Sequence, residues 1–465
     1  MKDFLKLYFP YNFFSKYQVL SLKLFLFLLV FAFAVWSRPS LIPKISPDGG
    51  GYWAIAENLS STDGDASIRP LFFPILIRLC MTISSDHWQI ILSVVHIFFH
   101  SLISTLLFSL FKKYGLKNLT SFFCALIIGF NPNLLVYATY ILADLPLAFL
   151  TTLTWYFVLK INESTVWDFK YIFLAGLFSG LALFTKPVAL LMIFCFLISI
   201  LLIKGFSKKY LKISFLMIVL NFSFFSFWKV FQVYQNPNPS LTKTSLIYGA
   251  INWTAIRSGY IDYGEGTDLH NRLIEKGQIE KAKSLDFELS FTMDEDPNFV
   301  EVFKSVRADM VLANDKEFAK KVLDQIPLKI VFLSLSKWHS YFTKRCFFPQ
   351  SESFPGMGNF IQMLYVKFYS YLYRPFLIVM LLISAFFLIK IGNFNVFYTS
   401  YCLLFYSSLV VTLGSGHSGE FIRYRVWTEY IMWFISLLTL GIILEKTLMV
   451  LNDAKKIIYK SMVDK

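Results

Sequence analysis

Two acidic residues stand where a carboxylate could do chemistry. Asp48 precedes three glycines in the run SPDGGGYWAIAENL, so its carboxylate could act as a general base toward an acceptor hydroxyl or amine. The alternative is that it caps a short helix over residues 52–59. Asp144 lies in the apolar run YATYILADLPLAFL, where an ionisable residue is costly and tends to face a cavity or a partner. Functional and structural roles explain Asp144 equally well.

Metal binding is a second kind of chemistry that the sequence suggests only weakly. His96 and His100 lie one helical turn apart in an apolar run, a spacing that puts both rings on one face. No third ligand lies nearby, so buried histidines bonded to neighbouring hydroxyls are the better explanation. Asp48 and Asp144 together could hold a divalent cation that bridges to a phosphate. The five cysteines are scattered without CxxC spacing, which argues against a zinc site.

Basic residues that could bind an anion occur in three separate places. Arg69 precedes a proline, Lys186 stands between two apolar runs in FTKPVAL, and a third group lies within residues 414–429. Arginine offers a planar bidentate donor to phosphate oxygens, and lysine offers a point charge. If these cations converge on one face, they would form a pocket for a phosphorylated lipid headgroup.

The third group is the run GSGHSGEFIRYRVWTEY, which holds His417, Arg423 and Arg425. These side chains could contribute to the same phosphate pocket. Alternatively, the two arginines pair with Glu420 and Glu429 and lock the loop. Both uses are compatible, because one side chain of such a cluster can pair while another binds.

The composition identifies the elements that must position these residues. Of the 465 residues, 56% are hydrophobic and 16% are charged, and the mean hydropathy is +0.56. A soluble domain of this length needs more polar surface, so we predict an all-α polytopic membrane protein. The net charge of +14 follows from Lys and Arg in short loops rather than from nucleic-acid binding.

The apolar runs predict about ten transmembrane helices, with a range of roughly 8 to 13. The expected helices cover residues 19–36, 88–111, 119–132, 134–160, 171–184, 188–203, 213–231, 376–391, 396–413 and 430–444. The first is expected to be a retained helix rather than a cleaved signal peptide. Basic residues then fall on the side of the N-terminus, which the positive-inside rule places in the cytoplasm. The outer side receives residues 37–83, 232–371 and 414–429.

Three regions follow from this topology. Residues 1–234 form an N-terminal transmembrane module with a catalytic external loop at 37–83, residues 235–371 form a small external cap with an interfacial helix at 326–348, and residues 372–465 form the C-terminal helices. No internal repeat supports an inverted-repeat transporter. No P-loop or Rossmann glycine pattern supports ATP or nucleotide-sugar binding.

The ordered series of motifs resembles the GT-C glycosyltransferases, specifically the bacterial branch similar to protein mannosyltransferases and aminoarabinose transferases. Asp48 with Tyr52 resembles the family's first acidic motif, and Arg69 with the following proline resembles its basic-Pro element. NPNLLVYATYILADLPLAFL places Asp144 at the second acidic position, and GLFSGLALFTKPVALL resembles a Gly-rich helix that ends in Thr-Lys-Pro. The resemblance spans most of the chain and is strongest over residues 40–205.

The chain also departs from the family's pattern. Ile68 stands where some relatives carry a further acid, which argues against a metal-assisted mechanism. The first motif has one Asp rather than an Asp-Glu pair, and Val426-Trp427 replaces the more usual Leu-Pro.

The resemblance implies a GT-C-like bundle that moves a hexosyl or pentosyl group from a polyprenyl-phosphate donor to a glycan, lipid or protein acceptor, with inversion. Asp48 would be the general base and Asp144 a second catalytic acid. The residues that would bind the substrate or the lipid phosphate are Tyr52, Arg69, Lys186, His417, Arg423 and Arg425. The resemblance implies no certain cofactor and leaves the use of the divalent cation considered above open. The expected location is a bacterial inner membrane, with a periplasmic active site.

Two other functions compete with this prediction. A transporter or flippase of a lipid-linked or anionic substrate would also place acids and cations around a membrane cavity. An O-antigen-type polymerase or ligase would share the many helices and the large external loop.

Overall fold

The structure is a computed structural model, and it describes residues 11–38, 40–45, 47–59, 69–164, 168–235, 359–372, 376–414 and 420–463. In these ranges every regular element is a helix, and the β pairing consists of one isolated bridge. The all-α fold class is therefore confirmed for the described part of the chain. The predicted cap lies largely outside these residues, as do its interfacial helix and His417.

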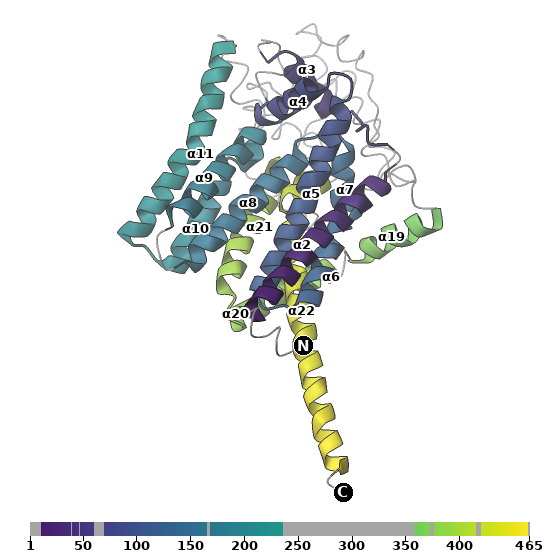
Figure 1. The fold of residues 1–465 in the computed structure, drawn as a ribbon. Helices are drawn as coiled ribbons and strands as arrows, with labels where there is room; N and C mark the ends of the chain where they lie inside the picture. Colours follow the sequence, from purple (N-terminus) through teal and green to yellow (C-terminus); the bar gives the residue numbers. More distant parts are fainter. Residues whose placement is uncertain are drawn as a thin grey trace, which may run out of the picture.

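The helices up to Gln235 form the larger part of the bundle (Figure 1). In chain order they are α2 (Tyr11–Trp36), α3 (Pro47–Glu57), α4 (Phe72–Ile83), α5 (Trp88–Lys113), α6 (Asn118–Gly129), α7 (Pro132–Val136), η1 (Tyr137–Thr139), α8 (Asp144–Glu163), α9 (Phe169–Thr185), η2 (Pro187–Ala189), α10 (Met192–Lys204) and α11 (Lys208–Gln235). The later helices are α19 (Asn359–Tyr371), α20 (Leu377–Lys390), α21 (Phe394–Gly414) and α22 (Glu420–Val463). The buried side chains of α20, α21 and α22 belong to the same apolar core as those of α5, α8 and α10.

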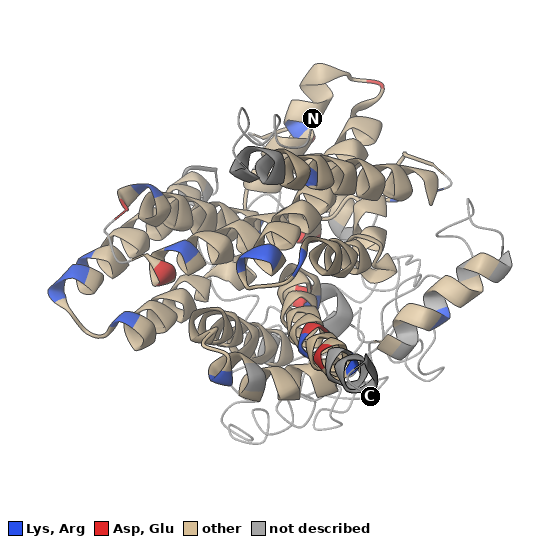
Figure 2. Ribbon diagram, turned by 60° about the horizontal axis from the view of Figure 1, so that its bottom comes forward, with Lys and Arg blue, Asp and Glu red and all other residues tan. Residues whose placement is uncertain are grey.

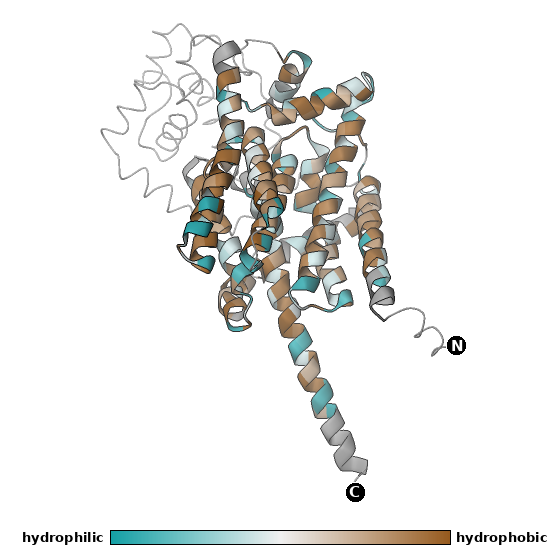
Figure 3. Cartoon of the chain, turned by 60° about the vertical axis from the view of Figure 1, so that its left-hand side comes forward, coloured by the Kyte–Doolittle hydropathy of each residue, from teal (hydrophilic) through white to brown (hydrophobic). Residues whose placement is uncertain are grey.

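Seven of the described helices are long and apolar enough to cross a membrane, or eight if the bent pair α6 and α7 is one span. Apolar residues run along the whole bundle, and polar residues gather toward its ends (Figure 3). The chain is therefore a multi-pass membrane protein. Because several apolar helices are shorter than a span, the count of about ten stays a prediction.

Two predicted helix boundaries are wrong. The expected span over residues 134–160 is broken, because the chain leaves the helix after Thr139 and re-enters one at Asp144. The Asn131 side chain caps α7 by accepting a bond from the Asn133 N–H at 3.0 Å, which starts a new short helix just after α6. The last span does not begin at residue 430, because α22 already begins at Glu420.

The end of the bundle that carries both described termini is basic (Figure 2). There Lys113 and Tyr114, at the end of α5, both contact Glu163, at the end of α8. The Lys204 ammonium donates to the Ser164 carbonyl at 2.9 Å. Helices α3 and α4 lie across the opposite end (Figure 1). This arrangement agrees with the charge pattern expected if the basic end faces the cytoplasm.

Small residues and interhelical hydrogen bonds hold the helices together. A Cβ on Gly180 of α9 would lie 2.4 Å from the Phe224 ring of α11, so only glycine permits this close approach. Trp155 on α8 donates to Ser400 on α21 at 3.0 Å, and Asn162 donates to Thr399 at 2.8 Å. These contacts fix α8, whose first residue is Asp144, against its neighbours.

Candidate active site

The predicted acid Asp144 and the predicted cation Lys186 form one ion pair. Asp144 is the first residue of α8, and Lys186 directly follows the last residue of α9. The Lys186 ammonium donates to Asp144 Oδ1 at 2.8 Å. The Asp144 side chain is 2% exposed and the Lys186 side chain 13% exposed. Lysine is thus the more accessible partner of the two.

Tyr52, on α3, and Arg69, just before α4, lie next to each other. The Arg69 guanidinium stacks over the Tyr52 ring at 4.6 Å from its centroid. Tyr52 in turn packs edge-on against Phe73 at 5.0 Å, and Phe73 stacks on His96 at 5.8 Å. A continuous row of rings therefore joins the first loop to the membrane helix α5. A cation held over an aromatic face keeps its charge available for an anion.

Asp48 lies in the first turn of α3, which begins at Pro47 and includes the three glycines that follow. The three glycines are thus helical, and proline at the first helical position presets the backbone dihedral. The helix already includes Asp48, so Asp48 is not its N-cap as the capping alternative required. A carboxylate in the first turn of a helix is still stabilised by the helix dipole. The Asp48 side chain lies outside the description, so its role as a base stays a prediction.

A short β bridge ties the segments that precede the two acids. The Lys44 N–H donates to the Thr139 carbonyl at 2.8 Å, and the Ile141 N–H donates to the Lys44 carbonyl at 3.0 Å. From this bridge the chain reaches α3 on one side and α8 on the other within a few residues. The bridge therefore brings the helix starts that carry Asp48 and Asp144 near to each other.

Sequence reasoning missed Arg38, which follows α2. It is 7% exposed, and its guanidinium donates to the Ser93 hydroxyl on α5 at 2.7 Å. Arg38 also acts electrostatically on His96, as does Asp144. The missed signal was position: Arg38 follows the end of the first span that the positive-inside rule predicts to be outside the cytoplasm, where basic residues are depleted.

Arg425 lies elsewhere, in a second polar cluster around α22. It donates to Glu429 at 3.2 Å one helical turn later, and both side chains are fully buried. Asn133 donates to both Glu429 oxygens, at 2.9 and 2.8 Å. This contact favours the pairing alternative for Arg425. The Arg423 side chain lies outside the description, so its phosphate-binding role stays a prediction.

The two histidines have different surroundings. His100 contacts the Tyr430 hydroxyl at 2.6 Å and the Gly129 carbonyl at 2.8 Å, so the hydroxyl-bonded histidine expected from the sequence is confirmed there. Neither ring nitrogen of His96 has a hydrogen-bond partner. No group of three or more His, Cys, Asp or Glu side chains placed to hold a metal occurs in the described ranges.

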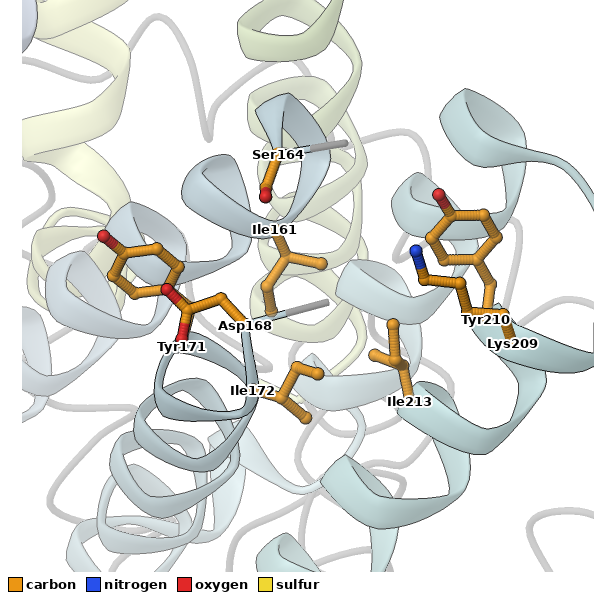
Figure 4. A pocket seen from close by; sticks show the side chains of 8 residues that line it. All are labelled: Ile161, Ser164, Asp168, Tyr171, Ile172, Lys209, Tyr210 and Ile213. Carbon is orange, nitrogen blue, oxygen red and sulfur yellow. The ribbon is translucent and has the colours of Figure 1, made fainter. Parts of the chain in front are cut away.

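A small pocket between α8, α9 and α11 lies at the basic end of the bundle. Ser164, Tyr171, Lys209 and Tyr210 lie around it, above isoleucine side chains (Figure 4). Its acid, Asp168, is used as a helix cap, because it accepts a bond from the Lys170 N–H at 3.0 Å. Since Asp144 begins α8 and this pocket lies where α8 ends, the pocket is separate from the candidate site.

The fold and the site together define a helical multi-pass membrane protein with a buried charged site near the end that carries the short helices α3 and α4, opposite the basic end. Residues 85–235 match the model of the dolichyl-phosphate-mannose-protein mannosyltransferase family. The matched segment begins before α5 and ends with α11, so it includes Asp144 and Lys186. The resemblance recognised from the sequence motifs is confirmed over this segment.

Two crystal structures of ArnT from Cupriavidus metallidurans are similar to this chain. The apo structure has 13% identity and a TM-score of 0.38, and the match covers 92% of this chain and 78% of ArnT. The structure bound to undecaprenyl phosphate has 13% identity and a TM-score of 0.37, with coverages of 87% and 78%. The comparison with curated proteins found no match.

Proposed function

We propose that this chain is a GT-C-type glycosyltransferase that moves a sugar from a polyprenyl-phosphate donor to an acceptor on the outer face of the membrane. The observation that carries the proposal is the buried Asp144–Lys186 pair, which lies within the segment matching a family named for a lipid-phosphate sugar donor. The pair belongs to the end of the bundle opposite the basic one, which fits an active site on the outer face.

The reaction is a displacement at the anomeric carbon of the sugar. Asp48 removes the proton of the acceptor hydroxyl or amine, and the acceptor atom attacks the anomeric carbon. The bond from that carbon to the phosphate oxygen breaks, so the lipid phosphate leaves with the electron pair and the configuration inverts. The protein mainly positions the reactants and stabilises the charge of the leaving phosphate.

Lys186 is the group best suited to bind that phosphate. Asp144 holds the ammonium in place through one oxygen at 2.8 Å, and the greater exposure of Lys186 leaves it accessible to the ligand. Arg69, stacked on Tyr52, adds a second cation near the first loop. In this arrangement Asp144 acts as a positioning residue. A divalent cation at Asp144 would compete with Lys186 for the same carboxylate.

The test is transfer of radiolabelled sugar from a panel of polyprenyl-phosphate sugars into membrane acceptors, at matched expression. Asp48→Asn should abolish transfer. Asp86→Asn, which neutralises an exposed acid in the turn after α4, is the control and should leave transfer unchanged. Full activity of Asp48→Asn would assign Asp48 a structural role in the first turn of α3. A folded protein that accepts no donor would favour the flippase or polymerase alternatives.

A further inference from the structure

Arg38 is a buried cation with an incomplete set of partners. One guanidinium nitrogen, Nη1, donates to Ser93 at 2.7 Å, and Ser93 in turn donates to the Ala138 carbonyl at 3.4 Å. The other terminal nitrogen, Nη2, is buried and has no hydrogen-bond partner. Burial lowers the pKa of Arg38 to about 9, because the charged form loses its hydration. Among the described residues, no acidic side chain forms an ion pair with Arg38.

His96 lies one turn after Ser93 on the same helix and has the same shortage of partners. It is fully buried, and both ring nitrogens are without a hydrogen bond. Its ring is held in place by stacking on Phe73. A buried polar group without a partner is costly. Arg38 and His96 lie on either side of Ser93, so one ligand that bonds to both would remove both costs.

The charges around these groups do not balance. Asp144 is the acid that acts on His96, and its carboxylate already accepts a bond from Lys186. The ion pair is neutral as a whole, so among the described side chains Arg38 contributes an excess positive charge. A planar guanidinium with a vacant nitrogen suits a tetrahedral oxyanion, which can accept bidentate hydrogen bonds. The neutral imidazole can donate one further bond.

We infer that Arg38, together with Ser93 and His96, binds the phosphate group of a lipid beside Lys186. This inference deepens the proposed function, on which it rests for the identity of the lipid as a polyprenyl phosphate. The phosphate supplies the missing negative charge and accepts the vacant bonds of Arg38 and His96. A phospholipid headgroup offers the same chemistry, so the experiment must separate the two sources.

The experiment measures binding to the full-length protein in phosphatidylcholine nanodiscs. Undecaprenyl phosphate, undecaprenol and phosphatidylglycerol are titrated separately, and affinity and melting temperature are recorded. Arg38→Met should weaken the binding of undecaprenyl phosphate by about tenfold to a hundredfold, as for loss of charged hydrogen bonds. His96→Phe keeps the ring on Phe73 and should weaken it by about three- to tenfold. Arg78→Met removes an exposed arginine of α4 and should change neither quantity.

The melting temperature of the empty protein separates ligand binding from a structural role. Removing an uncompensated buried charge should leave the melting temperature of Arg38→Met unchanged or higher, whereas the gain on adding undecaprenyl phosphate should be lost. A lower melting temperature with unchanged affinity would overturn the inference. Equal, Arg38-dependent binding of phosphatidylglycerol would support the phosphate site and assign it to a phospholipid. The experiment measures lipid binding and does not involve sugar transfer. Binding can therefore be observed even if the chain proves not to be a glycosyltransferase.

Discussion

The bundle contains two buried ion pairs whose surroundings differ. Arg425 and Glu429 lie on one helix, are fully buried, and Asn133 donates to both oxygens of the carboxylate. Asp144 and Lys186 join two helices, and the lysine is partly exposed. Beside the second pair lie Arg38 and His96, which have buried nitrogens without partners. A carboxylate bonded on both oxygens between fully buried partners indicates a structural ion pair, whereas a partly exposed cation beside buried polar groups indicates a ligand site.

The largest effect, on stability, should come from breaking the Arg425–Glu429 ion pair. Glu429→Leu leaves Arg425 buried without its counter-charge and should cost about 3–5 kcal/mol of stability. The measurement is the thermal unfolding midpoint in detergent or nanodiscs. The double variant Arg425→Met/Glu429→Leu should recover most of the loss, because it buries no charge. Failure of the double variant to recover would show that Arg425 has a further role.

Lys186→Met should break the ligand site instead. We expect sugar transfer to fall by about a hundredfold or more, because the leaving phosphate loses a cation. Lys186→Arg, which keeps the charge, should retain more activity. The measurement is initial transfer rate at saturating donor. If a larger amount of unfolded protein fully explained the lower rate, Lys186 would have a structural role like that of Arg425. The two ion pairs would then not differ in function.

Tyr430→Phe tests whether the polar cluster around α22 has a structural role only. The change removes the hydroxyl that contacts His100 at 2.6 Å and should cost about 1–3 kcal/mol, since it leaves a buried ring nitrogen without its partner. The transfer rate per folded molecule should stay the same. A changed rate at constant folded amount would connect this cluster to the reaction.

The smallest effect is expected at the first loop. Tyr52→Leu removes the ring beneath Arg69 and should raise the donor KM by about two- to fivefold, in line with a weak cation–π contact. Tyr52→Phe keeps the ring and should match the wild type. Steady-state kinetics with one donor distinguish the two variants, and equal KM values would show that the stack does not position Arg69.

The sequence indicated most of the fold class and part of the site, for reasons visible in single residues. Asp144 and Lys186 were conspicuous because charges are rare in apolar runs. Their pairing was hidden, because the two residues come from different helices and no local spacing relates them. Arg425 and Glu429 stand one turn apart, and that spacing favours a helix, so the early start of α22 could have been expected.

Arg38 was missed because apolar segments draw attention to their interiors rather than to their ends. The break before Asp144 was also hidden, since residues 134–143 are almost all apolar and the interruption depends on the Asn131 cap and the tertiary bridge at Lys44. Hydropathy is equally high for a buried helix and for a buried extended segment. Only the tertiary structure distinguishes them.

The bridge between Lys44 and Tyr140 has a consequence for how the molecule tolerates change. It acts as a common origin from which the connections to α3 and α8 are measured. On the α8 side, the side chains of Ile141, Leu142 and Ala143 are buried, so both the length and the side chains of that connection are constrained. Adding or removing one residue would change the reach of a connection by about 3.3–3.6 Å and displace the helix that follows. Insertions and deletions here should therefore be tolerated less well than in an exposed loop.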